Sequence, residues 1–311
     1  MNVLIIGSFP ETARNRIEAL FPGGWTLHIA PPEDAARYLP QAEVVIPEHI
    51  RINSEFLDRA PKLRMVQTGA GYDNVDVEAC TGRGIRVCNA AGINAQAVAE
   101  HTMALLLSYY KNIPCLDSFM KARREEQELS YSGGELAGKT VGIIGTGNIG
   151  RRVASCCQAF GMHVLGYSRR NDAVSGIGMV GLEELLRRSD VISVHVPLME
   201  ETRGMLGRGE FEKMKRSAVL INTSRGAVID EEALAEALRS GRIAGACLDV
   251  FEQEPLSRNS PLRDLENVLL TPHTAGFPDG VKYHEGRYRF FARNIERLAA
   301  GQRPEHSLNE V

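Results

Sequence analysis

The sequence predicts an α/β protein made of two domains, each built on a doubly wound parallel sheet. Its 311 residues exceed the roughly 100–200 residues of a typical single domain. Short apolar runs alternate with amphipathic segments along the whole chain, which is the pattern of parallel strands joined by helices. Glycines in G-x-G-x-x-G spacing also follow one apolar run in the second half, as at the turn from a strand into a helix.

The N-terminal half contains five apolar runs, which predict the strands of one small domain. In chain order they are NVLII, WTLHIA, EVVI, LRMVQT and IRVCN. At Asn94 the spacing of apolar residues becomes helical, and Asn94 is a residue type that caps helices. The segment NAQAVAEHTMALLLSYYKN therefore predicts a long helix that could cross between domains, followed by a polar stretch over residues 121–134.

The second half predicts six further strands, the number found in a complete dinucleotide-binding fold. These are TVGIIG, HVLGY, DVISVHV, AVLINT, GACLDV and NVLLTPH. A final helix is expected over residues 283–300, with Tyr288, Phe291, Ile295 and Leu298 on one face and Gly301 at its end.

The composition argues against several classes of protein. A net charge of −3 does not suit a protein whose main partner is nucleic acid. No apolar stretch is long enough to span a bilayer, and Gly7 and Pro10 end the short N-terminal apolar run, so a signal peptide is not expected. The six cysteines form no CxxC pair and are expected to be reduced thiols of a cytoplasmic protein without a bound metal.

The glycines Gly145, Gly147 and Gly150 lie between an apolar run and an amphipathic helix, which is the context that gives their spacing a mechanism. Gly145 permits the tight turn, Gly147 lets the backbone approach a pyrophosphate, and Gly150 allows the helix to pack closely on the strand. The N-terminus of the helix then offers N–H groups to the phosphates. The alternative is a glycine-rich turn without a ligand.

The choice of cofactor is expected to depend on the segment HVLGYSRRN. A carboxylate that binds the adenosine ribose usually follows the glycines by about 20 residues. Ser168 stands 18 residues beyond Gly150, and Arg169 and Arg170 follow it. Because arginine binds phosphate well, these residues predict that NADP(H) is preferred, with NAD possible. The alternative is that both arginines are solvated loop residues.

Three polar residues, Arg225, Glu254 and His273, follow three of the predicted strands, and the ends of parallel strands meet beside the cofactor. A guanidinium can bind a substrate carboxylate, and a histidine can exchange the proton of a hydroxyl group during hydride transfer. A carboxylate beside that histidine would fix its tautomer. Individually, the three could also be a surface cation, a solvated turn residue and a core histidine.

With these residues in place, the chain resembles the D-isomer-specific 2-hydroxyacid dehydrogenases. The resemblance extends over nearly the whole chain, through GAGYDNVD, NAQAVAEH, GKTVGIIGTGNIGRR, HVPLMEETRGML, INTSRGAVIDEEAL, ACLDVFEQEPL and LTPHTAG. It implies that Arg225 binds substrate, that His273 is the acid/base, and that Glu254 is its partner.

The resemblance also implies binding residues. Those expected at the cofactor are Gly145, Gly147, Asn148, Ile149, Gly150, Ser168, Arg169, Arg170, His195, Pro197, Thr202, Thr223 and Asp249. Those expected at the substrate are the backbone N–H groups of Gly69, Ala70 and Gly71, with Asn94 on the hinge side.

The family's architecture would place a Rossmann cofactor domain, residues 94–282, inside a smaller flavodoxin-like substrate domain formed by residues 1–93 and 283–311. It would also make the protein a homodimer built around the cofactor domain. The expected partners are then a second copy of the chain and a small 2-oxo or 2-hydroxy acid.

The substrate is expected to be a short neutral oxoacid such as glyoxylate or hydroxypyruvate. Relatives specific for 3-phosphoglycerate carry arginines where this chain has IPEHIR and VQTGAG, which offer only Arg51, with Glu48 nearby. Formate-specific relatives carry an amide where Glu254 stands. A phosphoglycerate dehydrogenase-like enzyme, a nucleotide-sensing corepressor-like protein and an NADP-binding module without turnover are the alternatives.

Overall fold

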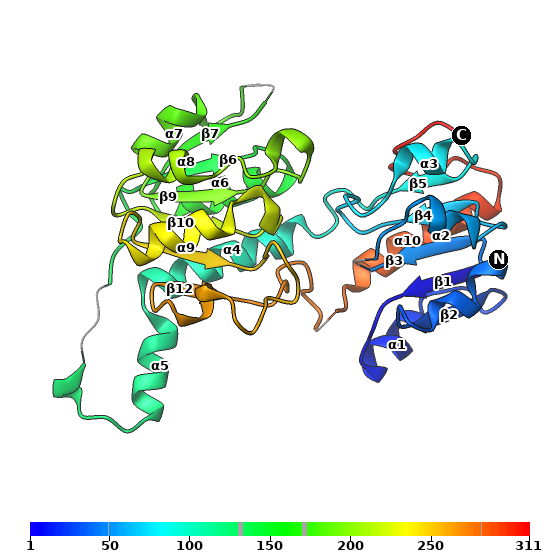
Figure 1. The fold of residues 1–311 in the computed structure, drawn as a ribbon, viewed down its shortest axis with the longest axis horizontal. Coiled ribbons are helices and arrows are strands. Elements are labelled where there is room, and N and C mark those ends of the chain that lie inside the picture. Colours follow the sequence, from blue (N-terminus) through cyan, green and yellow to red (C-terminus); the bar gives the residue numbers. More distant parts are fainter. Residues whose placement is uncertain (49, 130–132, 170–172, 281) are drawn as a thin grey trace. The chain divides into compact units, whose positions relative to one another are not determined.

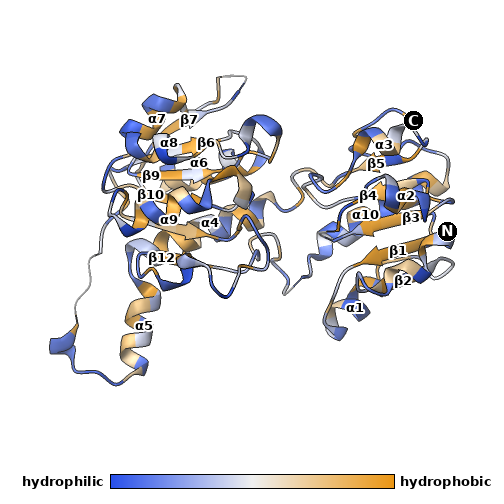
Figure 2. Ribbon diagram, viewed as in Figure 1, coloured by the Kyte–Doolittle hydropathy of each residue, from blue (hydrophilic) through white to orange (hydrophobic). Residues whose placement is uncertain are grey.

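The chain divides into two compact units in the computed structural model, which describes residues 1–48, 50–129, 133–169, 173–280 and 282–311 (Figure 1). The first unit comprises Met1–Asn94 and Phe277–Val311, and the second comprises Ala95–Gly276. Each unit holds one parallel sheet, so the predicted α/β fold class is confirmed. Apolar residues are concentrated in the strands of both sheets (Figure 2).

The sheet of the first unit contains the five strands expected from the sequence, in the order β2-β1-β3-β4-β5. Their bounds are β1 (Asn2–Ile6), β2 (Thr26–Ala30), β3 (Val44–Pro47), β4 (Met65–Gln67) and β5 (Arg86–Cys88). The α-helices of this unit are α1 (Glu11–Glu18), α2 (Ser54–Asp58), α3 (Val77–Thr81) and α10 (Glu285–Ala299). Strand order 2-1-3-4-5 is that of flavodoxin-like sheets.

Alternate residues of β1 enter two different cores. Val3 and Ile5 pack with residues of α1 and α10, whereas Leu4 and Ile6 pack with residues of α2 and α3. Since successive side chains of a strand point to opposite faces, these two cores cover both faces of the sheet. A strand buried on both faces is expected to be a continuous apolar run, such as NVLII.

The sheet of the second unit has seven strands in the order β12-β11-β10-β9-β6-β7-β8. Six are the predicted ones: β6 (Thr140–Ile144), β7 (His163–Tyr167), β9 (Val191–Val194), β10 (Val219–Asn222), β11 (Gly245–Leu248) and β12 (Val268–Leu270). The seventh, β8 (Gly178–Met179), was not predicted, because two residues carry no periodic signal. Successive strands are added on one side of β6 as far as β8 and on its other side from β9 onward. The point between β6 and β9 is therefore the topological switch point, where ligands usually bind in such sheets.

The α-helices of the second unit are α4 (Ala95–Tyr110), α5 (Ile113–Lys121), α6 (Asn148–Ala159), α7 (Leu182–Arg188), α8 (Arg208–Lys213) and α9 (Glu231–Arg239). Short 3-10 helices are present at Ala35–Arg37, Leu39–Gln41, Glu126–Glu128, Glu200–Thr202, Gly226–Val228 and Pro261–Asp264. Within the part of the chain described, no helix is both long and apolar enough to cross a membrane.

The helix expected from Asn94 onward differs from the prediction in three respects. α4 ends at Tyr110, because Asn112 has a left-handed backbone (φ 52°) that interrupts the helix before α5 begins. The helix also lies wholly inside the second unit. Finally, the side-chain oxygen of Asn94 is buried without a hydrogen-bond partner within the described residues, so it does not cap α4.

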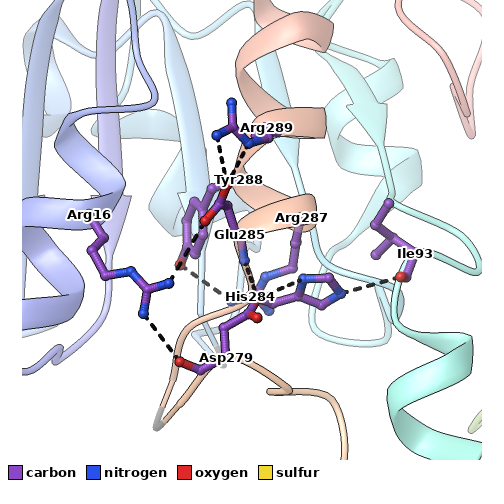
Figure 3. A network of polar contacts seen from close by, with 8 residues as sticks. All are labelled: Arg16, Ile93, Asp279, His284, Glu285, Arg287, Tyr288 and Arg289. Atoms are coloured by element: carbon purple, nitrogen blue, oxygen red, sulfur yellow. Dashed lines mark hydrogen bonds and ion pairs between the residues drawn. The ribbon is translucent and has the colours of Figure 1, made fainter.

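The boundary near residue 280 follows from contacts of the segment before α10. The sequence suggested a division at residue 282, whereas the contacts divide the chain at Gly276. Phe277 lies under the guanidinium of Arg287 at 5.1 Å, and Asp279 accepts a hydrogen bond from Arg16 of α1 (Figure 3). These contacts join the segment to the first unit.

The final helix, α10, buries the predicted face. Tyr288, Phe291 and Ile295 are fully buried and Leu298 partly so, and the positive φ of Gly301 (70°) follows the helix end. The helix α10 is far from β1 in the sequence, but it packs against the sheet of the first unit (Figure 1).

Replacing Phe291 with alanine should lower the free energy of unfolding of the first unit by about 3–5 kcal/mol, because it removes a fully buried ring and leaves a cavity. Urea denaturation followed by circular dichroism measures this loss. Phe160→Ala is the matched control, since Phe160 is 45% exposed. Equal losses in the two variants would contradict the assignment of Phe291 to a tightly packed core.

Candidate active site

The carboxyl edge of the second sheet gathers the residues that follow its strands. Ile144 of β6 pairs with Tyr167 and Val194, Asn222 pairs with Val194 and Leu248, and Leu248 pairs with Leu270. Each paired residue is the last of its strand, so the next residues emerge at one edge: Gly145, Ser168, His195, Thr223, Asp249 and Thr271.

The glycine turn after β6 has almost no room for side chains. Gly145 has φ +99°, and a Cβ on it would lie 2.7 Å from the carbonyl carbon and oxygen of His195. A Cβ on Gly150 would lie 2.0 Å from the carbonyl oxygen of Gly145. Both contacts are with backbone, which cannot move aside cheaply, so the turn requires glycine at these two positions.

Gly147 differs from the other two glycines, because a Cβ on it would meet no atom of the described residues within 4 Å. It is the N-cap residue of α6, which begins with Asn148 and Ile149, and no side chain in the described part of the chain caps this helix. The first N–H groups of a helix have no partner inside the helix. The turn therefore offers open space and N–H donors to an anionic group.

The residues after β7 lie beside this turn. The N–H of Gly145 donates to the carbonyl of Tyr167 at 2.8 Å, and Ser168 comes next in the chain. Ser168 is half-buried and Arg169 is exposed; Arg170 lies outside the described residues. No carboxylate occupies the position directly after β7.

The loop after β9 is anchored on a neutral histidine. The N–H of His195 donates to the carbonyl of Ile144 at 2.7 Å, and its Nε2 lies 2.8 Å from Oγ of Ser193. Burial lowers the pKa of His195 to about 3, so the ring is uncharged at neutral pH. Further on, the hydroxyl of Thr202 donates to the carbonyl of Pro197 at 2.7 Å and closes the loop.

The loop after β10 holds Arg225 through the side chain of Asn222. The Asn222 oxygen accepts from the N–H and the hydroxyl of Ser224, at 3.0 and 2.7 Å, and its amide donates to the carbonyl of Arg225 at 2.9 Å. Thr223, between them, is buried with its hydroxyl 3.1 Å from that of Thr102 on α4. Asn222 thus fixes the backbone from which the guanidinium extends.

Glu254 and His273 form a direct pair. Nδ1 of His273 lies 2.6 Å from Oε2 of Glu254, and the other carboxylate oxygen accepts from the N–H of Phe251 at 3.1 Å. The two side chains are 31% and 28% exposed. A carboxylate at this distance favours a proton on Nδ1.

The carboxylate of Asp249, fully buried, organises the chain around β12. It accepts hydrogen bonds from the hydroxyl of Thr271 at 2.6 Å and from the N–H groups of Thr274 and Ala275, both at 2.9 Å. Nε2 of His101 lies 3.5 Å away. Burial alone would raise the pKa of Asp249, but these donors outweigh it and lower the pKa below its ordinary value.

His273 lies between residues that Asp249 holds. Its own N–H donates to the carbonyl of Asp249 at 2.8 Å, and its backbone has φ 53°. A histidine is uncommon in this left-handed region. The surrounding hydrogen bonds therefore maintain a strained backbone that sets the direction of the imidazole.

Several residues of this edge were not predicted to take part. A Cβ on Gly226 would lie 1.8 Å from the carbonyl carbon of Phe251, so Gly226 lets the loops of Arg225 and Glu254 come into contact. His101, Thr271, Thr102 and Ser193 also contribute hydrogen bonds. The available signals were the motif NAQAVAEH, which contains His101, and the place of Thr271 two residues before His273.

The predicted substrate loop belongs to the first unit, where it follows β4. The carbonyl of Gly69 accepts from the N–H of Ala90 at 2.9 Å, and that of Ala70 accepts from the side chain of Asn89 at 3.1 Å. Gly71 is the last residue of this loop. Within the described residues, the hydrogen bonds that the loop forms use its carbonyl groups.

Among all the residues that the structure describes, no group of three or more His, Cys, Asp or Glu side chains could hold a metal ion.

Comparisons with known proteins identify related chains. Residues 103–275 match the model of the D-isomer specific 2-hydroxyacid dehydrogenase NAD binding domain. A glyoxylate reductase of Aeropyrum pernix is 42% identical over 270 residues, which are 83% of this chain and 80% of the relative. A D-3-phosphoglycerate dehydrogenase of Archaeoglobus fulgidus is 39% identical over 89% of this chain, which spans only 53% of that relative.

Among solved structures, an acyclic imino acid reductase in complex with NADPH and D-arginine has a similar fold. Its TM-score is 0.87, its sequence identity is 31%, and the match covers 99% of this chain and 100% of that one.

Replacing Asp249 with asparagine should destabilise the second unit by about 1–3 kcal/mol at pH 7, because an amide cannot accept from all these donors. A carboxylate with a lowered pKa stabilises the fold above its ordinary pKa of 3.8 and loses this effect as the pH falls through its folded value. The difference from the wild type in urea denaturation should therefore shrink below pH 3.8.

Asp117→Asn is the control for this experiment, because Asp117 is a surface residue of α5 with a side chain 56% exposed. A difference between wild type and Asp249→Asn that stays constant with pH would show that the ionised carboxylate is not what stabilises the loop.

Proposed function

The chain belongs to the D-isomer-specific 2-hydroxyacid dehydrogenase family, and we propose that it transfers a hydride between NADP(H) and C2 of a small 2-oxo or 2-hydroxy acid of the D configuration. The observation that carries this proposal is the 2.6 Å pair of His273 and Glu254. The pair lies on the same sheet edge as the glycine turn of Gly145, within one unit, which supports the proposal of an acid/base beside a bound nucleotide.

In the proposed reduction, a bound reduced nicotinamide supplies the hydride to C2. His273 gives a proton from Nε2 to the carbonyl oxygen, which becomes the hydroxyl, and takes it back in the reverse direction. Glu254 stabilises the protonated imidazole through Nδ1. Arg225 binds the carboxylate of the acid, for which the planar guanidinium is suited.

For the cofactor, we propose that NADP(H) is preferred and that NAD is possible. The open space at Gly147 and the uncapped start of α6 fit a pyrophosphate. Ser168 and Arg169, in place of a carboxylate, favour a 2′-phosphate. The complex of the imino acid reductase with NADPH is consistent with this, while the matched family model is described as NAD binding.

We propose that six further residues contact the cofactor, because of their position at the carboxyl edge of the second sheet. Asn148, Ile149, His195, Pro197, Thr202 and Thr223 belong to the loops of this edge. Because the carboxylate of Asp249 is engaged by four groups, its proposed role is to hold His273 beside the nicotinamide.

For the substrate, we propose glyoxylate or hydroxypyruvate, with the N–H groups of Gly69, Ala70 and Gly71 binding the carboxylate. The similarity to a glyoxylate reductase supports the first. Because the chain is also similar to a D-3-phosphoglycerate dehydrogenase, 3-phosphohydroxypyruvate, the 2-oxo form of 3-phosphoglycerate, belongs in the panel of acids to be tested. The discriminating assay is oxidation of NADPH with each 2-oxo acid, since a corepressor-like protein would bind the nucleotide without turnover.

A homodimer and a cytoplasmic location complete the proposal. Two apolar side chains of α5, Ile113 and Met120, are 54% and 69% exposed, and burial of such side chains favours association. The six cysteines are all free, which is usual in a reducing compartment.

Replacing His273 with alanine should abolish turnover, by at least about 100-fold in kcat, because it removes the proton donor. NADPH binding, measured by fluorescence titration, should stay close to that of the wild type. Glu254→Gln keeps the size of the side chain but not its charge, and should lower kcat to an intermediate level. An unaltered kcat in His273→Ala would refute the role assigned to this residue.

Replacing Arg169 with alanine should lower kcat/KM for NADPH by about 10- to 100-fold, the effect of losing one charge-assisted hydrogen bond. The value for NADH should change little, because NADH has no 2′-phosphate. Arg188→Ala, which alters an exposed pair with Glu184 on α7, should change neither value. A wild-type preference for NADH that Arg169→Ala leaves intact would rule out the proposed selector.

A further inference from the structure

A histidine of the helix α4 reaches the carboxyl edge of the second sheet. Nε2 of His101 lies 3.1 Å from Oγ1 of Thr271 and 3.5 Å from Oδ1 of Asp249. The His101 side chain is 23% exposed, whereas that of Asp249 is fully buried. Thr271 directly follows β12 and stands two positions before His273, and all four residues belong to the second unit. His101 therefore contacts the group of hydrogen bonds that holds His273.

The direction of these hydrogen bonds follows from the number of protons available. The hydroxyl of Thr271 has one proton, which it donates to Oδ1 of Asp249 at 2.6 Å. The Thr271 oxygen can then only accept a hydrogen bond from His101. Because its pKa is lowered, Asp249 is ionised at neutral pH and also only accepts. Both oxygens that face Nε2 of His101 therefore favour a proton on this nitrogen.

The next residue of α4 fixes the helix at the same edge. The hydroxyl of Thr102 donates to the carbonyl of Val98 at 2.7 Å. Its oxygen therefore accepts from the hydroxyl of Thr223, which follows β10 and lies 3.1 Å away. Thr102 and Thr223 are both buried. Two consecutive residues of α4 thus bond to the residues that follow β10 and β12, which sets the position of the His101 ring relative to the sheet.

The hydrogen bond from His101 acts on the segment that carries His273. Without this donor, Thr271 would keep its bond to Asp249 but would no longer be held from the side of α4. The backbone of His273, with φ 53°, belongs to the same short segment, and its N–H donates to the carbonyl of Asp249 at 2.8 Å. Because a displacement of 1 Å can cost an enzyme about 100-fold in rate, a small movement of Thr271 is enough to slow a proton transfer at His273.

We propose that His101 is a positioning residue, which donates from Nε2 to Thr271 and through Thr271 and Asp249 holds the imidazole of His273 in place. The inference rests on the proposed function, in which His273 exchanges a proton with the substrate. It gives the two histidines opposite tautomers, with the proton on Nε2 in His101 and on Nδ1 in His273. In this arrangement His101 acts through its neighbours and not on the reacting atoms.

The first test measures the position of the proton. Long-range 1H–15N NMR spectra of the full-length protein, labelled with 15N at histidine, show which ring nitrogens carry a proton at neutral pH. The signals of His101 are identified by their absence from the spectrum of His101→Gln. We expect a proton on Nε2 of His101. A ring without a proton on Nε2 would overturn the inference, and this measurement does not depend on turnover.

The second test separates the donor from the ring. His101→Gln places an amide N–H close to the position of Nε2, whereas His101→Phe keeps the ring and removes the donor. With NADPH and glyoxylate, His101→Phe should lower kcat by about tenfold. His101→Gln should keep kcat within about twofold of the wild type, and the Kd for NADPH should change by less than about twofold in both variants. His163→Phe, at an exposed position at the start of β7, is the matched control and should change neither quantity.

The outcomes separate the inference from the proposed function. If the ring of His101 only filled space, His101→Phe would retain kcat and His101→Gln would lose it. That order, or an equal kcat in the two variants, would overturn the positioning role and leave the dehydrogenase assignment standing. If His101→Phe fails to fold, the tautomer measured by NMR decides. A wild type that binds NADPH but turns over no 2-oxo acid would overturn the proposed function, and the positioning role with it.

Discussion

The hydrogen bonds accepted by the buried carboxylate of Asp249 are the interaction on which the carboxyl edge of the second sheet depends. Its hydrogen bonds from Thr271, Thr274 and Ala275 connect the end of β11 to the chain after β12. His273 lies between these donors with an unfavourable backbone, which persists only where its surroundings enforce it. The buried charge of Asp249 thus maintains the orientation of the His273 ring. Without this charge, His273 would not be held at hydrogen-bonding distance from Glu254.

The glycines of this edge act by letting backbones touch. Gly145 and Gly150 bring the turn after β6 against itself and against His195, and Gly226 brings the loop of Arg225 against Phe251. No hydrogen bond could replace such contacts, because they depend on the absence of a Cβ. The edge is therefore shaped by steric exclusion as much as by polar bonds, and the polar side chains are placed on loops whose separation is already fixed.

Much of the fold was predictable from local pattern, and the unpredicted parts have identifiable causes. The eleven apolar runs became strands because both faces of each sheet are buried. The separate helix α5 was missed because the left-handed Asn112 leaves no signal in hydrophobic periodicity. The nearness of Glu254 and His273 followed from topology. By contrast, Glu48 looked like an isolated acid, since its partner Arg287 is 239 residues away in sequence, and spacing carries no information about such a pair.

The position of α10 in the chain has a consequence for synthesis on the ribosome. Residues 1–94 are made before the second unit, yet one apolar face of their sheet is covered in part by Tyr288, Phe291 and Ile295, which are made after it. The intervening unit is complete in sequence before that cover exists. During translation the first segment must therefore keep an apolar surface exposed while a second domain emerges behind it, which is the interval in which nascent chains aggregate or recruit chaperones.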